Sequence, residues 1–192
     1  MSLEFNPATH QYAWAGQLVP SVTQILKPIL DYSRIDPEVL AAAAARGNAV
    51  HLATELDDQG TLDPDSVDEA LAGYIAAYRA WKREASPVIL LSETQVYHGT
   101  MRYAGTLDRV VAIGDDEWLI DIKTGDNVIG AVGPQTAAYE AALNFGKPLR
   151  RAFLQLKSDG SYRFRELTSP RDWAVFLSCH LIHRFKQENQ YV

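Results

Sequence analysis

Residues 105–125, GTLDRVVAIGDDEWLIDIKTG, contain two strand-like apolar runs on either side of an acidic turn. Short runs of this kind, rich in Val and Ile and separated by turn residues, predict a β-hairpin that reverses near Gly114. The runs nevertheless contain Asp108, Asp121 and Lys123. A charge inside a strand costs stability unless another group compensates it. Any fold of this chain must therefore provide partners for these three side chains.

The geometry of such a hairpin can bring the three charges together. If the chain reverses near residues 114–117, Asp108 falls roughly opposite residues 121 to 123, about 5 Å away across the pair. Because side chains alternate along a strand, Asp121 and Lys123 share one face and Ile122 points to the other, which can be core.

Opposed carboxylates repel each other, but a divalent cation reverses that effect. Carboxylate oxygens are the ligands that Mg2+ prefers, and a neighbouring lysine can position a water or stabilise charge on a phosphate. The arrangement suits metal-assisted hydrolysis of a phosphodiester. The alternative is an Asp121–Lys123 ion pair on a half-exposed face, which is the commoner meaning of an isolated Asp-x-Lys sequence.

The whole chain, 192 residues with 47% hydrophobic and 22% charged content, predicts one globular domain over 1–192. We expect a hairpin and a helix in 1–35, a helical segment in 36–85 and a sheet core in 86–192. Helices followed by three strands, a helix, two strands and a helix indicate an α/β or α+β fold with helices packed on a sheet.

Start signals are present for each predicted helix. They are Ser21, Asp36 with Pro37, Ser66, Pro134, and Ser169 with Pro170. Gly146 is expected to end the fourth of these helices. Gly-containing turns predict two further hairpins, at Ala15–Gly16 and at Asp159–Gly160.

Charge limits how the chain can hold nucleic acid. The formal net charge of -6 argues against binding by bulk positive charge alone, but it is compatible with an acidic site neutralised by metal ions. Several basic residues lie between residues 147 and 165. We favour the interpretation that they form a solvated strand face over the interpretation that they bind a row of phosphates. They are Lys147, Arg150, Arg151, Lys157, Arg163 and Arg165.

The single cysteine, Cys179, excludes an internal disulfide and a cysteine-ligated iron–sulfur cluster. No signal peptide is evident, so a reducing, cytoplasmic location is the simplest expectation. No apolar run approaches the ~20 residues that span a bilayer, so no membrane association is expected. Walker A and Gly-x-Gly-x-x-Gly sequences are absent, which leaves kinase, ATPase and dehydrogenase functions without support.

The sequences GTLD, LIDIKTG and QTAAY together resemble the PD-(D/E)xK nuclease superfamily, most closely its RecB-like and phage exonuclease branch. The resemblance implies a central mixed β-sheet flanked by helices, as in the restriction-endonuclease-like core. It also implies that Asp108 and Asp121 are the two acidic positions, that Lys123 is the catalytic lysine, and that the Ile122 carbonyl faces the metal. Mg2+ or Mn2+ would be the cofactor.

The sequence RGNAVHLATE resembles the upstream helix that carries a metal-ligating histidine in this superfamily, which points to His51. Helical spacing places Gly47, His51 and Glu55 on one face. Gly47 would allow close approach to the sheet, and Glu55 could orient the imidazole. An ordinary helical histidine and an ordinary helix-forming glutamate are the alternatives.

Further positions match the superfamily less specifically. Glu93 lies where many members have a glutamate on the strand before the hairpin, although a glutamate there can also face solvent. Gln135 and Tyr139 match the Q-x-x-x-Y helix, which supports the site or contacts DNA. Tyr12 and Trp14, in a segment similar to the start of phage-encoded members, can either pack in the core or stack on bases.

The sequence therefore predicts a metal-dependent deoxyribonuclease, an exonuclease of phage-type recombination or repair. DNA is the expected partner, with a single-strand annealing or recombination protein, or a second copy of the chain, as further candidates. A non-catalytic DNA-binding scaffold and an endonuclease of the same superfamily are the alternatives.

Overall fold

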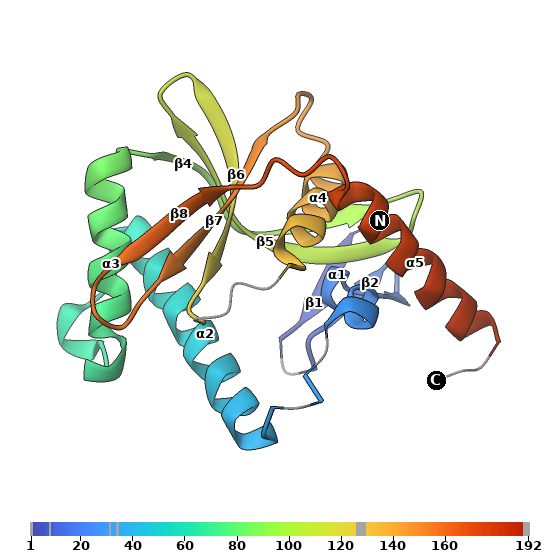
Figure 1. The fold of residues 1–192 in the computed structure, drawn as a ribbon, viewed down its shortest axis with the longest axis horizontal. Coiled ribbons are helices and arrows are strands. Elements are labelled where there is room, and N and C mark those ends of the chain that lie inside the picture. Colours follow the sequence, from blue (N-terminus) through green and yellow to red (C-terminus); the bar gives the residue numbers. More distant parts are fainter. Residues whose placement is uncertain (1, 8, 31, 34, 126–129, 190–192) are drawn as a thin grey trace.

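The computed structural model of the protein describes residues 2–7, 9–30, 32–33, 35–125 and 130–189 (Figure 1). Two 3-10 helices, Lys27–Ile29 and Pro64–Ser66, accompany the regular elements. These are β1 (Leu3–Asn6), β2 (Gln11–Trp14), β3 (Gln17–Val19), α1 (Val22–Ile25), α2 (Pro37–Asp58), α3 (Glu69–Ala85), β4 (Val88–His98), β5 (Tyr103–Ile113), β6 (Asp116–Lys123), α4 (Val132–Leu143), β7 (Arg150–Leu156), β8 (Tyr162–Glu166) and α5 (Asp172–Glu188).

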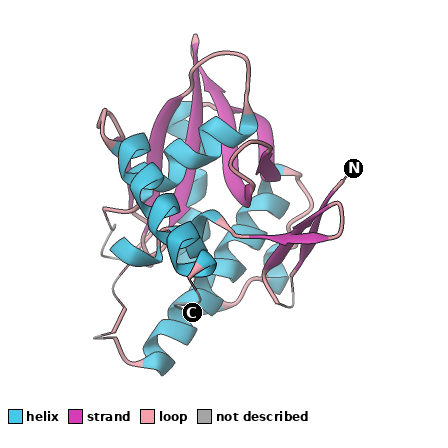
Figure 2. Ribbon diagram, turned by 90° about the vertical axis from the view of Figure 1, so that its right-hand side faces the viewer, coloured by secondary structure: helices cyan, strands magenta, loops and turns pink. Residues whose placement is uncertain are grey.

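The main sheet has five strands in the order β4-β5-β6-β7-β8. Strands β6 and β7 are parallel and the other neighbours are antiparallel, so the sheet is mixed. This confirms the predicted α+β fold with a mixed sheet flanked by helices. A second, three-stranded sheet, β1-β2-β3, lies to one side of it and carries the N-terminus (Figure 2). The predicted hairpins at Ala15–Gly16 and Asp159–Gly160 both form.

Helices cover both faces of the main sheet, as the alternation of apolar residues requires. On one face, Ile120 and Ile122 pack with Val50 of α2 and with Tyr78 and Trp81 of α3. The opposite face packs against α1, α4 and α5 through another set, which includes Val110, Leu119, Ala138, Tyr139 and Phe176. No helix in the described ranges is long and apolar enough to cross a membrane.

Two of the predicted helix starts are confirmed. The Ser21 side chain accepts a hydrogen bond from the Gln24 amide, and the Gln24 side chain accepts one from the Ser21 amide, which completes a capping box. Asp36 accepts from the Glu38 amide, with Pro37 in the first turn of α2. These caps could be found from the sequence because each depends on contacts within four residues.

The Ser66 cap is wrong, because Asp68 caps α3 by accepting from the Ala70 amide, and Ser66 ends a 3-10 turn instead. An ionised carboxylate two residues further on is the stronger acceptor for the free amides of a helix start.

The other boundaries are shifted by two or three residues. Helix α4 begins at Val132, ahead of Pro134, and ends at Leu143. Asn144 follows as its C-cap, and its φ of 47° gives it the left-handed conformation expected of Gly146. Helix α5 begins at Asp172, because the Ser169 hydroxyl accepts from the Arg171 amide in a turn that precedes the helix.

Helix α3 lies very close to the turn between β7 and β8 at Gly73. A Cβ atom at this position would lie 1.8 Å from the carbonyl oxygen of Ser158, far inside contact distance. The glycine is therefore required by the packing of α3 on the hairpin. Gly47, in the middle of α2, was expected to serve a similar purpose, and that expectation is wrong. A Cβ there would meet only Thr124 Oγ1, at an ordinary 3.9 Å.

We predict that Gly73→Ala lowers the free energy of unfolding by roughly 1–3 kcal/mol, because the added methyl must displace backbone. Gly47→Ala is the matched control in another helix, and it should leave stability unchanged or raise it by up to about 1 kcal/mol. Urea unfolding of both variants measures the difference. Equal midpoints for the two variants would show that α3 can move away from the turn without cost.

Candidate metal centre

Three carboxylates lie in a row across strands β4, β5 and β6. In the antiparallel pairing of β4 with β5, the two neighbours of Glu93 lie opposite the two neighbours of Asp108. Glu93 and Asp108 therefore lie side by side. In the pairing of β5 with β6, Arg109 lies opposite Ile120. Asp108 precedes Arg109 and Asp121 follows Ile120, so the two aspartates lie opposite each other. The hairpin therefore has the register that the sequence predicts, with Asp108 facing Asp121 in the adjacent strand.

Helix α2 adds an imidazole to this row. His51 Nδ1 lies 3.2 Å from Glu93 Oε1 and 3.7 Å from Asp108 Oδ1. One potential ligand atom from each of these three residues lies within 4.8 Å of the other two. Nitrogen and carboxylate oxygen atoms at such separations are positioned to bind a metal ion.

Asp121 is almost fully buried, at 1% exposure, and its carboxylate is incompletely paired. Its Oδ2 atom lies 2.7 Å from Lys123 Nζ. Its Oδ1 atom has no hydrogen-bond partner within the described part of the chain. A buried oxygen of this kind requires an explanation, and a divalent cation beside Asp108 would supply one. Asp121 lies outside the 4.8 Å group, so its role as a ligand belongs to the proposal below.

The backbone of Ile122 also reaches the site. Its amide donates a 2.6 Å hydrogen bond to Asp108 Oδ2, which fixes that carboxylate and leaves Oδ1 toward His51. The expected contact between the Ile122 carbonyl and a metal ion stays a prediction.

The Q-x-x-x-Y pair of α4 lies beside the lysine. Lys123 Nζ is 3.5 Å from Gln135 Oε1, and Gln135 Nε2 donates to the Tyr139 hydroxyl oxygen at 3.1 Å. Gly105 makes room for this arrangement, because a Cβ there would lie 2.5 Å from Tyr139 Cε1. The glycine of GTLD is thus needed for the position of the tyrosine ring.

The protonation states follow from burial and from the neighbouring charges. Burial raises the pKa of Asp108 to about 6. The positive charge of His51 opposes this rise, and the negative charge of Asp121 adds to it. For His51, burial lowers the pKa, but the carboxylates of Asp108 and Glu93 outweigh it and raise the pKa to about 9. Burial also lowers the pKa of Lys123, and Asp121 and Asp108 raise it above its ordinary value. Without a metal ion, two protonated side chains therefore balance the acids near neutral pH.

Glu93 rather than Glu55 hydrogen bonds the imidazole. Glu55 lines the same cleft but accepts from Gln59 Nε2 at 3.5 Å. Glu93 has a φ of 42°, a conformation that costs a non-glycine residue on the order of 1–3 kcal/mol. In this conformation its carboxylate contacts both His51 and Arg109.

Arg109 is a residue of the site region that sequence reasoning missed. It is completely buried, and its guanidinium donates to Glu93 Oε1 at 2.9 Å, to Asp58 Oδ2 at 2.8 Å and to Thr54 Oγ1 at 3.1 Å. It joins β5 to β4 and to the helix that carries His51. The available signal was an arginine on the core-facing side of a strand, a position that requires acidic partners.

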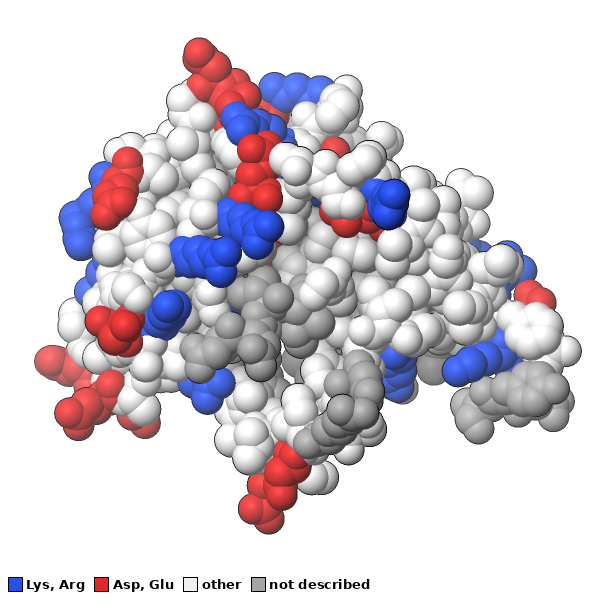
Figure 3. All heavy atoms as spheres, in the orientation of Figure 1, with Lys and Arg blue, Asp and Glu red and all other residues white. Residues whose placement is uncertain are grey.

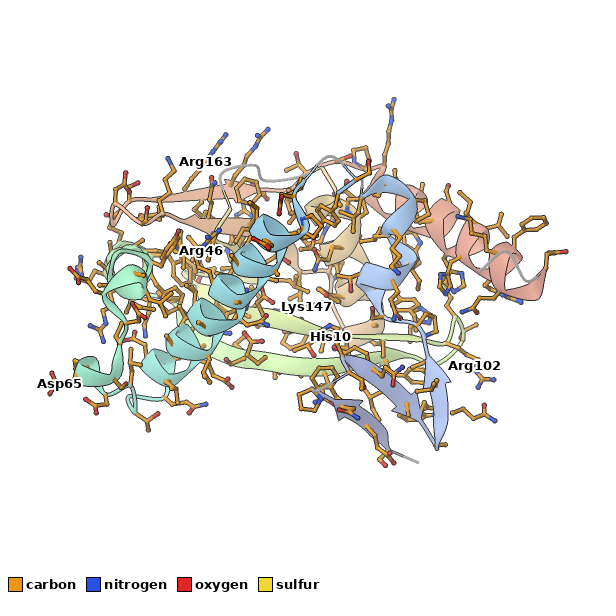
Figure 4. The ribbon with its side chains drawn as sticks, turned by 90° about the horizontal axis from the view of Figure 1, so that it is seen from below. His10, Arg46, Asp65, Arg102, Lys147 and Arg163 are labelled. Atoms are coloured by element: carbon orange, nitrogen blue, oxygen red, sulfur yellow. The ribbon has the colours of Figure 1, made fainter. Side chains whose placement is uncertain are left out.

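The site opens into a cleft with a volume of about 640 Å3. Helix α2 and the small sheet form its two walls, and strands β4 to β6 form its floor; Figure 4 shows these elements from below. The described residues that line it are Phe5, Pro7, His10, Tyr12, Ser21, Val22, Thr23, Asn48, His51, Leu52, Glu55, Glu93, Gln95, Gly105, Thr106, Asp108, Lys123, Gln135 and Tyr139.

Several of the basic residues near the β7–β8 hairpin are paired with acids. Arg150 contacts both Asp116 and Glu166. Lys147 lies 3.1 Å from Glu117. Figure 3 shows basic side chains next to acidic ones on this face. These pairs agree better with a charged, solvated face than with a continuous phosphate track.

No family model matches the chain, and no curated protein is similar to it at a significant level. Solved structures that are similar to this chain over most of its length include those of SSO0001 and LHK-Exo. The crystal structure of SSO0001 shares 15% sequence identity with this chain, with a TM-score of 0.48. The alignment covers 87% of this chain and 75% of the SSO0001 chain. The structure of LHK-Exo in complex with dAMP shares 14% sequence identity with this chain, with a TM-score of 0.42. The alignment covers 90% of this chain and 89% of the LHK-Exo chain. Similarities this low leave the family of the chain undefined.

We predict that Arg109→Met lowers the free energy of unfolding by about 3–5 kcal/mol, because it leaves buried carboxylates without their cation. Arg184→Met is the control. Arg184 pairs with Glu188 on an exposed helix face, and its loss should cost about 0.5 kcal/mol or less. Urea unfolding compares the two variants. Similar losses would mean that the buried arginine contributes no more than a surface pair.

We also predict that binding of Mn2+ releases about one proton near neutral pH. A metal needs the free lone pair of His51, whose pKa is about 9, so affinity should rise with pH up to about 9. It should fall below about pH 6, where Asp108 takes up a proton. Calorimetry in buffers of different ionisation enthalpy measures the release. His51→Ala should abolish it and His183→Ala should not; equal proton release by both variants would contradict the assignment.

Proposed function

We propose that this chain is a divalent-metal-dependent deoxyribonuclease that hydrolyses DNA phosphodiester bonds, acting as an exonuclease. The observation that carries the proposal is a possible metal-binding group, His51, Glu93 and Asp108, in a cleft that Lys123 also lines. Lys123 is partly exposed there and forms an ion pair with the buried Asp121. A half-exposed surface ion pair would need neither the imidazole nor the additional buried acids.

In this proposal Asp108 and Asp121 hold Mg2+ or Mn2+, with His51 and the carbonyl of Ile122 as further ligands. The Oδ1 atom of Asp121, which accepts no hydrogen bond from a described residue, and the Oδ1 atom of Asp108, which is directed toward His51, support this assignment. The ion supplies Lewis-acid stabilisation of the charge on a phosphate oxygen.

Lys123 keeps its ammonium proton, because the neighbouring carboxylates raise its pKa. It therefore acts as a hydrogen-bond donor that orients the attacking water and stabilises charge on the phosphate, rather than as a general base. Gln135 and Tyr139 hold the ammonium in position from α4. Glu93 orients His51, and Glu55, further along the cleft, is a candidate contact to DNA.

The assignment as an exonuclease rests on the resemblance of the hairpin and Q-x-x-x-Y sequences to the RecB-like and phage branch. A single-strand annealing or recombination protein is the partner expected for such an enzyme, in the cytoplasm. An exonuclease degrades linear DNA and spares closed circles, whereas an endonuclease cuts both, so circular DNA separates the two.

We predict that the protein degrades linear DNA with Mg2+ or Mn2+, that EDTA stops the reaction, and that Lys123→Ala slows it by about 100-fold or more. Lys147→Ala is the matched control, because Lys147 pairs with Glu117 on the surface, 60% exposed, and should leave the rate unchanged. Gel assays of end-labelled DNA measure the rates. Full activity in Lys123→Ala would remove this lysine from the mechanism.

The scaffold alternative makes a different prediction for the same protein. A scaffold would bind DNA equally well with and without divalent ions and would cut nothing. Asp108→Asn and Asp121→Asn would then leave DNA binding intact.

A further inference from the structure

The wall of the cleft opposite the acidic residues is aromatic and comes from the small N-terminal sheet. Phe5 of β1 stacks on Tyr12 of β2, with ring centroids 4.6 Å apart, and the His10 ring lies edge-on to Phe5 at 5.2 Å. All three rings line the cleft. His10, labelled in Figure 4, lies on the side of the small sheet that faces α2.

The buried and exposed members of this wall have different roles. Tyr12 is 2% exposed, and its hydroxyl hydrogen bonds the Thr106 hydroxyl at 2.8 Å, so it anchors the small sheet to β5. Phe5 is only partly buried and His10 is exposed, so both remain accessible from the cleft. Trp14 is stacked on Tyr97 and lines a different hollow.

Leu52 lies across the cleft from these rings, on α2. It is 57% exposed although it is a large apolar side chain, and it lines the cleft one residue beyond His51. Leu52 therefore adds an apolar side chain to the α2 side of the cleft, beside the polar Asn48 and Glu55, while the floor carries acidic residues.

The cleft provides little charge for holding a phosphate backbone. Among its described lining residues, Lys123 is the only lysine or arginine. Binding of a duplex by its phosphates uses several such cations, whereas single strands are held largely by stacking of bases on aromatic rings. A volume of about 640 Å3 suits a small-molecule-sized ligand, such as one or two nucleotides, rather than a double helix.

From these observations we propose that Phe5 and His10 form a base-stacking subsite, which holds an unpaired base of a DNA strand while Leu52 covers its other side. The proposal rests on the proposed nuclease function, because it places the neighbouring phosphate over the acidic floor. Phe5, His10 and Leu52 are positioning residues: they act on the base, several bonds away from the reacting phosphorus.

The test uses short oligothymidylates with 2-aminopurine at the terminal positions, and matched oligonucleotides in which the terminal nucleotides lack bases. Binding is measured in Ca2+ by 2-aminopurine fluorescence for the first set, and by competition for the second. We expect fluorescence to fall on binding, and we expect intact ends to bind more tightly than abasic ends.

Phe5→Leu keeps the apolar volume but removes the ring, and it should weaken binding of intact ends by about 5- to 100-fold. Binding of abasic ends should change little, so the preference for a base should disappear. Leu52→Ala, on an exposed helix face where folding is not at risk, should reduce the same preference by a smaller factor. Phe185→Leu, an exposed aromatic on α5 outside the cleft, is the control and should preserve it.

Equal binding of intact and abasic ends by the wild-type protein, or an unchanged preference in Phe5→Leu, would overturn the subsite. Hydrolysis of the same oligonucleotides by the wild-type protein in Mn2+ tests the nuclease separately. Hydrolysis that does not depend on Phe5 would contradict only the proposed subsite. Base stacking without hydrolysis would support the subsite and contradict the proposed nuclease function.

Discussion

Mutual repulsion among three carboxylates in neighbouring strands is the constraint that the surrounding structure has to satisfy. Each carboxylate has its own cation within 4 Å; the pairs are Glu93 with Arg109, Asp108 with His51, and Asp121 with Lys123. These cations come from β5, α2 and β6, so the balance of charge itself ties a helix to the sheet. Hydrogen bonding is incomplete at Asp121, where neither buried oxygen has a hydrogen bond from a described residue, although Oδ2 lies 2.7 Å from Lys123 Nζ. A carboxylate oxygen without a hydrogen-bond donor can still accept a further cation.

The position of His51 depends on polar contacts more than on apolar burial. Helix α2 is 22 residues long, yet among them only Val50, Ala53 and Thr54 are buried. Its C-terminal end is held instead by Asp58, which accepts hydrogen bonds from Arg109, from the Tyr78 hydroxyl and from Lys82. The imidazole is therefore located by a network that reaches through α3 and β5, and a change in that network can move His51 without contacting it.

The sequence predicted the hairpin face correctly because two simple rules decide it: strands alternate with a period of two, and turn residues fix the register. Those rules allow a register that brings Asp108, Asp121 and Lys123 to one side of the sheet, and the structure has that register. Arg109 could not be assigned in the same way, since its partner Asp58 lies 51 residues away and no local pattern connects them. The positive φ of Glu93 could not be predicted from the sequence, because only a glycine marks such a position clearly. Ser66 failed as a cap because Asp68, a better acceptor, stands two residues later.

The parallel pairing of β6 with β7 has a consequence for how the molecule assembles in time. Strands β4, β5 and β6 are joined by short turns and can pair soon after collapse, which brings the acids together early. A parallel neighbour requires a crossover, here through α4, and its longer loop closure makes it slower to form. The acidic row would then exist transiently before Gln135 and Tyr139 reach the lysine. During that interval a divalent ion in the medium would stabilise the folding intermediate and so assist refolding.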